Sequence, residues 1–192
     1  MQEKTVINTT FAIGASCFWA ALVSKFIGGH INIEVILNAT LAGGVAIGAS
    51  ADLFKAVYIA LLVGSFAGIL SCCGFMKIGP YLSEKIGLHD TCGVHSLHGM
   101  PGVLGGLVSA IILSPNLDLT EERNYKLANG QAQTQIFGLL TTLAFAIGAG
   151  FTGGFLASRK CWNGPTVMFL DTMHFGSEAD FPQEYLVDDK DE

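Results

Sequence analysis

Charged residues are scarce in this chain of 192 residues: lysine, arginine, aspartate and glutamate together make up 14% of it. A typical soluble domain contains about 25% charged residues, so this chain lacks the side chains that would cover a water-exposed surface. Apolar residues make up 51%, and the mean hydropathy is +0.50. A soluble protein of this composition would expose large apolar patches and aggregate. The scarcity of charge therefore excludes the ordinary soluble classes and predicts a membrane protein.

Basic residues are few, and they form no basic face. The 10 lysines and arginines are outnumbered by 16 acidic residues, and the formal net charge is −6. Nucleic-acid binding needs a concentrated positive surface, so we exclude nucleic acid as a partner. Much of the negative charge lies in residues 178–192. We predict that residues 161–192 form an acidic tail in solvent.

We expect neither a secretory leader in this sequence nor a disulfide framework. Residues 1–4 are too short and too mixed in charge for the n-region of a signal peptide. Three of the five cysteines lie inside apolar stretches, which argues against a secreted disulfide scaffold.

Long uncharged stretches are present instead, and each is a candidate transmembrane helix. A bilayer core about 30 Å thick needs roughly 20 helical residues. The uncharged stretches are residues 5–24, 35–51, 56–76, 91–117 and 127–158. We therefore predict an all-α membrane protein with about five transmembrane helices in residues 1–160. Residues 80–87 begin with proline and end with glycine, which predicts a short surface helix.

The positions of lysine and arginine predict how the spans are oriented. The tail then lies in the cytosol and Met1 lies outside, which suggests that further spans precede it. The cytosolic side receives Lys25, Lys77, Lys85, Arg159 and Lys160, and the other side receives Lys4, Lys55, Arg123 and Lys126.

Glycine is abundant, with 24 residues. Two glycines four residues apart lie on one helix face and let another helix approach closely. We predict helix-packing faces at such pairs, although glycine-rich helices also contain them by chance. The pairs are Gly44 and Gly48, Gly64 and Gly68, Gly102 and Gly106, and Gly150 and Gly154.

Histidines head the fourth apolar stretch: His89, His95 and His98 lie within ten residues. Ionisable groups inside a membrane are costly and tend to face a cavity or a partner. Desolvation disfavours the charged imidazolium, and a neutral imidazole offers one donor and one acceptor. Such a group suits ammonia better than it suits a cation. His98 is the best pore candidate, and the alternative is a hydrogen bond to a neighbouring helix.

The residues around His98 allow several roles. His95 shares roughly the same helix face and is a further candidate to contact the guest, although we favour a position that faces a vestibule or another helix. Asp90 either attracts a cation to the mouth or caps the helix start, and we favour the cap. Cys92, His95 and His98 are spaced three apart, but ligands at that spacing converge poorly on one ion. We predict no metal, no cofactor and no enzymatic activity, with a membrane metalloenzyme as an alternative.

The segment His-Asp-Thr-Cys-Gly-Val-His-Ser-Leu-His-Gly-Met-Pro-Gly-Val-Leu-Gly-Gly, residues 89–106, resembles the segment of Rh glycoproteins that leads into a pore-histidine helix. Asn-Ala-Thr-Leu-Ala-Gly-Gly-Val, residues 38–45, resembles a second signature of that branch of the ammonium transporter/Rh family. Residues 2–9 resemble the start of an earlier helix of the family, and the likeness runs in order to about residue 158.

The resemblance implies an ammonium or ammonia channel in the plasma membrane, a trimer with one pore through each subunit. Ammonium is deprotonated at an outer vestibule, and ammonia passes two hydrogen-bonded histidines, the second of which His98 matches. Asp90 matches a family acidic residue, and His95 lies where relatives often have asparagine. The chain resembles only the later helices of the fold, so the first half of the pore is missing from the likeness. The expected partners are ammonia or ammonium, the lipid bilayer, and copies of itself or full-length relatives. A non-transporting interaction subunit is the alternative.

Overall fold

A computed structural model of the chain describes residues 2–90, 92–114, 117, 119–120 and 130–158. These residues form helices and one isolated antiparallel bridge between Phe54 and Thr120. The chain divides into two compact units, residues 1–143 and 144–192. The predicted all-α class is confirmed.

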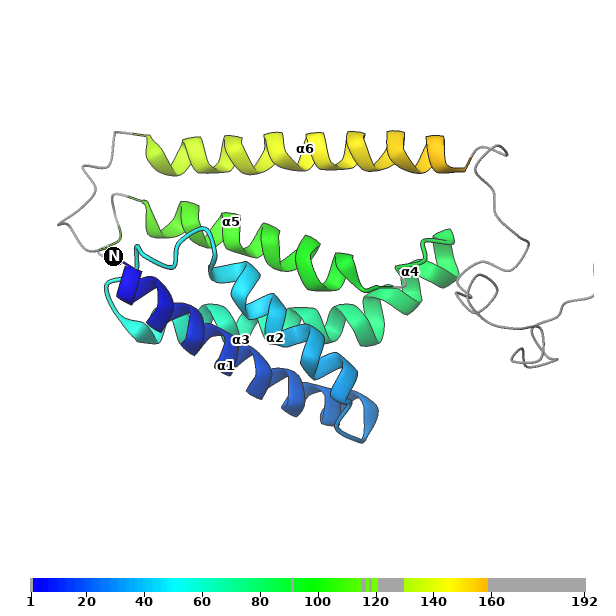
Figure 1. The fold of residues 1–192 in the computed structure, drawn as a ribbon, viewed down its shortest axis with the longest axis horizontal. Helices are drawn as coiled ribbons and strands as arrows, with labels where there is room; N and C mark the ends of the chain where they lie inside the picture. Colours follow the sequence, from blue (N-terminus) through cyan, green and yellow to red (C-terminus); the bar gives the residue numbers. More distant parts are fainter. Residues whose placement is uncertain (1, 91, 115–116, 118, 121–129, 159–192) are drawn as a thin grey trace, which may run out of the picture. The chain divides into compact units, whose positions relative to one another are not determined.

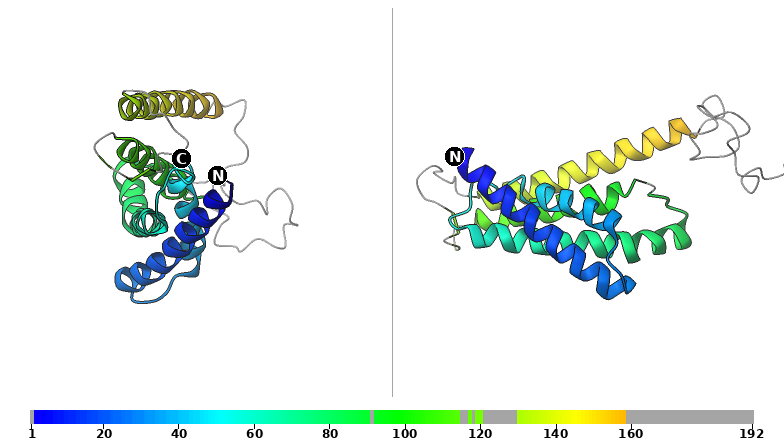
Figure 2. Two further views of the ribbon diagram at one scale, coloured as in Figure 1. Left: turned by 90° about the vertical axis from the view of Figure 1, so that its left-hand side faces the viewer. Right: turned by 60° about the horizontal axis from the view of Figure 1, so that its bottom comes forward.

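Three helices form the base of the first unit: α1 (Gln2–Gly28), α2 (Ile33–Ile47) and α3 (Val57–Cys73). α1 packs along both α2 and α3, and α2 also packs on α3 (Figure 1). The start of α2 is capped by Asn32, whose side chain accepts a hydrogen bond of 3.2 Å from the amide of Val35. Figure 2 shows α1, in dark blue, crossing the other two helices.

α1 buries a ladder of small or polar residues, one every fourth position. Every member lies on one face of the helix because four residues make just over one turn. Two glycines of α3 lie against this ladder: a Cβ on Gly64 would collide with the backbone of Ala12, and one on Gly68 with the backbone of Ser16. The close approach of the two backbones is therefore possible only without side chains on α3. The ladder consists of Asn8, Ala12, Ser16, Ala20 and Ser24.

Polar members of the ladder have partners within the bundle. The side-chain amide of Asn8 donates to the carbonyl of Ala51 at 2.8 Å, and the Ser16 hydroxyl donates to the carbonyl of Ala39 at 2.5 Å. An unpaired polar group in a membrane costs several kcal/mol, so these bonds make the polar ladder tolerable.

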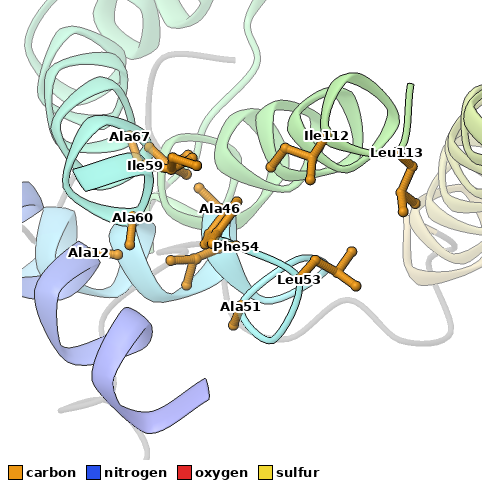
Figure 3. Close-up of a cluster of buried hydrophobic side chains, with 12 residues drawn as sticks. Ala12, Ala46, Ala51, Leu53, Phe54, Ile59, Ala60, Ala67, Ile112 and Leu113 are labelled. Atoms are coloured by element: carbon orange, nitrogen blue, oxygen red, sulfur yellow. The ribbon is translucent and has the colours of Figure 1, made fainter. Parts of the chain in front are cut away.

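The apolar core of the first unit lies where α1, α2, α3 and α5 meet the turns after α2 (Figure 3). Phe54 is 1% exposed and is among the largest buried side chains, and Ile47 and Ile112 are equally enclosed. Alanines fill much of the rest, which keeps the helices close. The buried cluster comprises Ala12, Ala46, Ile47, Ala51, Leu53, Phe54, Ile59, Ala60, Val63, Ala67, Ile112 and Leu113.

The helix of the third predicted span continues past residue 76 and joins the predicted surface helix. α3 continues through a π-turn, η1 (Gly74–Ile78), into α4 (Gly79–Ile86). The predicted surface helix at 80–87 is therefore present as α4, which buries none of its residues, and it is continuous with the preceding helix. Pro80 has no amide hydrogen to bond the preceding turn. The π-turn, in which the amide of Gly79 bonds the carbonyl of Gly74, widens the helix just before the proline and lets it continue.

The same arrangement recurs in the fourth span. A π-turn, η2 (His95–Gly99), runs directly into α5 (Met100–Ile112), with Pro101 as the second residue after the turn. The helical stretch is thus shorter than the predicted 91–117. α2 is also shorter than the predicted 35–51, because residues 48–53 form turns.

The described helices include three that are long and apolar enough to cross a membrane, Gln2–Gly28, Val57–Ile86 and Gln131–Ala157, and α2 is a shorter apolar helix. The last of the three is α6, which continues across the boundary between the two units. The predicted tail, residues 161–192, lies outside the described residues, and its boundary at residue 160 stays a prediction.

Candidate pore-lining segment

The segment that carries the histidines begins where α4 ends. Gly87 has φ +66° and turns the chain: its amide bonds the carbonyl of Ser83 at 3.1 Å, and the amide of Leu88 bonds the carbonyl of Leu82 at 3.3 Å. This pair of bonds is the Schellman arrangement that glycine favours at a helix end. The chain therefore turns back immediately, and Nδ1 of His89 comes within 3.0 Å of the Ser83 hydroxyl.

Asp90 caps the start of the next helical stretch. One of its carboxylate oxygens accepts a hydrogen bond of 2.8 Å from the amide of Val94, and the other accepts one of 2.9 Å from the amide of His95. Amides in the first turn of a helix have no partner inside the helix, and a carboxylate both satisfies them and complements the positive end of the helix dipole. Asp90 therefore fixes the position at which the helical stretch that carries His95 and His98 begins.

Gly93 makes the approach to this helix possible. Its φ of +65° lies in the region that side chains disfavour, and its amide bonds the carbonyl of Asp90 at 3.0 Å. A Cβ at this position would also collide with the ring of Phe75 from η1. The ring of Phe75 in η1 thus packs directly against Gly93, and this contact helps to hold the two π-turns together.

The π-turn η2 separates a buried face from an exposed one. Ser96 and Leu97 are buried, with 3% and 6% of their surfaces exposed. His95 and His98 are both exposed in the described part of the chain. A π-turn contains more residues per turn than an α-helix, so the two imidazoles diverge more than α-helical spacing would predict. The ring of His95 lies near Gly99, with Cδ2 3.5 Å from the position a Cβ would take there.

Beyond the histidines, α5 is anchored by its small and buried residues. Pro101 is fully buried, and a Cβ on Gly105 would lie 2.6 Å from the carbonyl oxygen of Ala46 in α2. Gly105, which belongs to none of the four predicted pairs, therefore lets α5 approach the backbone of α2 closely. Gly74 has the same function in η1: a Cβ there would lie 2.7 Å from the hydroxyl of Ser96.

The predicted glycine pairs lie in different surroundings. Gly64 and Gly68 lie against the backbone of α1, as described above. A Cβ on Gly106 would lie 2.8 Å from the side chain of Leu139, whereas one on Gly44 or Gly102 would meet only ordinary side-chain contacts at 3.7 Å or 4.0 Å.

Two of the remaining predicted glycines, Gly150 and Gly154, would meet nothing within 4 Å among the described atoms. For Gly48 the nearest atoms are carbonyl oxygens of its own helix, 3.4 Å away in the case of Val45. In α2 the backbone contact is made instead by Gly43, which would place a Cβ 2.7 Å from the carbonyl oxygen of Ala12.

A cavity of about 250 Å³ lies between η1, α4, the residues that lead into η2, and Ser96 of η2. Sequence reasoning did not single out the two serines of its wall, because an isolated serine in an apolar stretch carries no distinctive signal. The lining consists of Phe75, Gly79, Pro80, Ser83, His89, Asp90, Gly93 and Ser96.

The described residues of this segment do not form a metal site. No group of three or more histidine, cysteine, aspartate or glutamate side chains within the described ranges could hold a metal ion. The set proposed as an alternative, Cys92, His95 and His98, is accordingly not brought together, and all three residues are exposed.

The sequence model of the Ammonium Transporter Family matches residues 1–161, which include every described helix. The chain belongs to this family. It is a family of transporters rather than of enzymes, and the resemblance inferred from residues 89–106 is confirmed.

Sequence alignments with relatives of the Rh branch cover most of the chain. It is 37% identical to the ammonium transporter Rh type C of Rattus norvegicus, over 84% of the chain and 35% of that protein. It is 34% identical to the Rh type A protein of Mus musculus, over 98% of the chain and 37% of that protein. The chain therefore spans little more than a third of the length of these relatives.

Solved structures of the family also match most of this chain while the chain covers less than half of each of them. The Rh50 protein of Nitrosomonas europaea, described as a conducting channel of the Rhesus family, matches with a TM-score of 0.73 and 33% identity over 88% of this chain and 40% of that one. A sensor Amt protein matches with a TM-score of 0.66 at 23% identity, which supports the fold alone.

Proposed function

We propose that this chain supplies one part of an ammonia-conducting pore of the Rh type, and that His98 is the imidazole it contributes. The observation that carries the proposal is the exposure of His98 on a helical stretch whose other face is buried. An exposed imidazole within an apolar span is costly against lipid, and this cost disappears when the imidazole lines a passage for a polar guest.

The chemistry of such a pore follows from the properties of imidazole. A neutral imidazole pairs with ammonia through one donor and one acceptor, while the apolar surroundings exclude the charged ammonium ion. Ammonium must therefore release a proton before it enters and regain one after it leaves. His98 guides the neutral molecule, and Asp90 acts as a positioning residue because its cap sets the start of η2. His95, on the same exposed side, lines the approach to His98.

The setting of the pore is part of the proposal. The chain lies in the plasma membrane with its C-terminal tail in the cytosol, as the lysine and arginine positions predict. It assembles as a trimer or with full-length relatives, and its immediate partners are ammonia or ammonium and the lipid bilayer. The name of the Rh50 channel and the names of the Rh ammonium transporters support ammonia or ammonium as the transported partner.

The test is ammonia flux into liposomes, measured with an internal pH dye after an ammonium jump. The chain is reconstituted alone and together with the complementary part of an Rh relative. We expect faster alkalinisation than in empty liposomes only in the complemented sample. His98→Asp should abolish or redirect this flux, whereas His30→Asp, at an exposed histidine between α1 and α2, should leave it unchanged.

Other outcomes would contradict the proposal in different ways. Normal flux in complemented His98→Asp liposomes would remove His98 from the pore. Absence of flux, combined with co-purification of the chain with a full-length relative, would favour the non-transporting interaction subunit instead.

A further inference from the structure

We propose that Lys25 and Lys77 form a surface that binds the headgroups of anionic phospholipids at one end of the helix bundle. The two side chains come from different helices: Lys25 lies in the last turn of α1, and Lys77 lies in η1, where α3 passes into α4. Both lysines are exposed. Such a surface is independent of conduction by the chain, because neither residue belongs to the proposed pore.

The packing of α1 on α3 places the two lysines at one level of the bundle. Gly64 of α3 lies against Ala12 of α1. The glycine one turn further along α3 lies against the residue one turn further along α1, so the two helices run parallel. Each residue of α3 is therefore level with the α1 residue numbered 52 lower. This register places Lys77 level with Lys25.

The ends of the two helices remain in contact at this level. A Cβ on Gly28, shortly after Lys25, would lie 2.8 Å from Cε of Met76, which directly precedes Lys77. The two lysines therefore come from adjacent helix ends.

The opposite ends of the same helices show where this level lies in a membrane. Lys4 precedes Lys25 by 21 residues, a helical rise of about 32 Å, which matches a bilayer core about 30 Å thick. The same register places Lys4 level with residue 56, next to Lys55. Lysines thus mark both ends of α1 and of the helix that follows Lys55. Lys25 and Lys77 accordingly lie at the boundary between hydrocarbon and headgroups, where a lysine side chain extends toward the phosphates.

The charge at this level favours an anionic partner. Neither Lys25 nor Lys77 forms an ion pair with another described residue. The acidic residues nearest to them in sequence are Glu34 and Glu84, which are exposed and form no ion pair with described residues either. The lysine and arginine distribution assigns this end to the cytosolic leaflet, which is rich in anionic lipids. Lipid phosphate is therefore the counter-ion that meets the two ammonium groups.

Lys85 provides a matched comparison. It is exposed, as Lys77 is, but lies eight residues further along the continuous helix, a rise of about 12 Å. This separation exceeds the Debye length of about 10 Å at 0.1 M salt. A contact at the level of Lys77 therefore does not involve Lys85, whereas a diffuse attraction between net charges would involve both lysines.

The experiment measures which phospholipid lies beside α1 in bilayers that contain the full chain. Trp19 is exposed on α1, six residues before Lys25, so brominated acyl chains of adjacent lipids quench its fluorescence. Trp162→Phe removes the other tryptophan. Mixtures in which either phosphatidylglycerol or phosphatidylcholine is brominated give the relative affinity for the two lipids. We expect phosphatidylglycerol to be preferred.

Substitutions test each lysine at 0.1 M salt. Lys25→Gln and Lys77→Gln should each lower the relative affinity for phosphatidylglycerol about five-fold, the effect of one lysine near a charged membrane surface. Lys25→Arg and Lys77→Arg should retain the preference, because the positive charge remains. Lys85→Gln should also leave it unchanged.

Three results would overturn the surface. Equal affinity of the unaltered chain for the two lipids would remove the preference itself. A loss in Lys85→Gln equal to that in Lys77→Gln would mean that net charge alone attracts the lipid. Inorganic phosphate, added in place of chloride at equal ionic strength, should have no effect. Suppression of the preference by phosphate would show that the lysines bind a free anion and not a lipid headgroup.

Discussion

Gly93 is the residue on which the approach of the two π-turns depends. It has a positive φ of +65° and also lies under the ring of Phe75, whereas Gly87 has nearly the same φ, +66°, and open space around it. The two glycines therefore separate backbone strain from steric contact.

We expect Gly87→Ala to lower the free energy of unfolding by about 1–2 kcal/mol, the cost of a left-handed conformation for a residue with a Cβ. Gly93→Ala should cost about 1–3 kcal/mol more, because the added methyl group overpacks against Phe75. Denaturation in mixed micelles measures both values. Combining Gly93→Ala with Phe75→Ala should recover part of the loss, and strict additivity of the two changes would refute the contact.

Asp90 combines a structural and an electrostatic role, which two substitutions can separate. Asp90→Ala removes the cap and should cost about 0.5–2 kcal/mol of stability. Asp90→Asn keeps an oxygen acceptor for the first turn, so it should retain most of the stability lost in Asp90→Ala. Thermal denaturation of the two variants in detergent is the measurement. Equal losses in both would mean that the charge, rather than the cap, holds the start of η2.

At the scale of helices, the α1 ladder and the glycines of α3 determine how closely the bundle packs. Gly64→Ala and Gly68→Ala would place a methyl group inside the backbone of α1. We expect each to lower the free energy of unfolding by at least about 2 kcal/mol, through helix separation and overpacking. Gly14→Ala, in α1 where nothing lies within 4 Å, is the matched control and should be neutral or slightly stabilising. Comparable losses at all three sites would attribute the effect to glycine content and not to this interface.

The sequence predicts where the helices lie better than it predicts their ends and the π-turns that connect them. Gaps between charges locate the spans because a charge inside the bilayer is costly: residues 5–24 lie within α1, and α6 lies within residues 127–158. The same rule places the end of the third helix too early, because that helix passes Lys77 and continues through η1 and α4 to Ile86. A long lysine side chain can reach the membrane surface, so a charge does not mark a helix end. The π-turns before Pro80 and Pro101 have no sequence signal beyond the proline itself.

Packing and the site show a similar division. Glycine spacing identifies Gly64 and Gly68 but not Gly43, Gly74 or Gly105, because single glycines are indistinguishable from chance without a partner helix. The ladder of α1 also lacks a glycine signal, since it is built from alanine, serine and asparagine. Asp90 is recognisable as a cap because capping depends on local sequence. The cavity is not recognisable, because its wall joins residues 75 and 96, which only the fold brings together.

At the scale of the whole molecule, the orientation in the membrane decides which side the cavity faces. The predicted arrangement places the residues before η2 and the C-terminal tail on the same, cytosolic side. Cysteines provide the test, because Cys92 is exposed in the turn before η2 whereas Cys72 is buried in α3. Cys161 lies in the predicted tail.

We expect a variant that retains only Cys92 to react with a membrane-impermeant maleimide in inside-out vesicles and not in right-side-out vesicles. A variant that retains only Cys161 should behave in the same way, since the lysine and arginine distribution assigns both residues to the cytosol. The Cys72-only variant should resist labelling on either side until the protein is denatured, because its side chain is enclosed. Labelling of Cys92 from outside would reverse the predicted topology. Labelling of Cys92 and Cys161 from opposite sides would instead mean that the number of membrane crossings between them is odd.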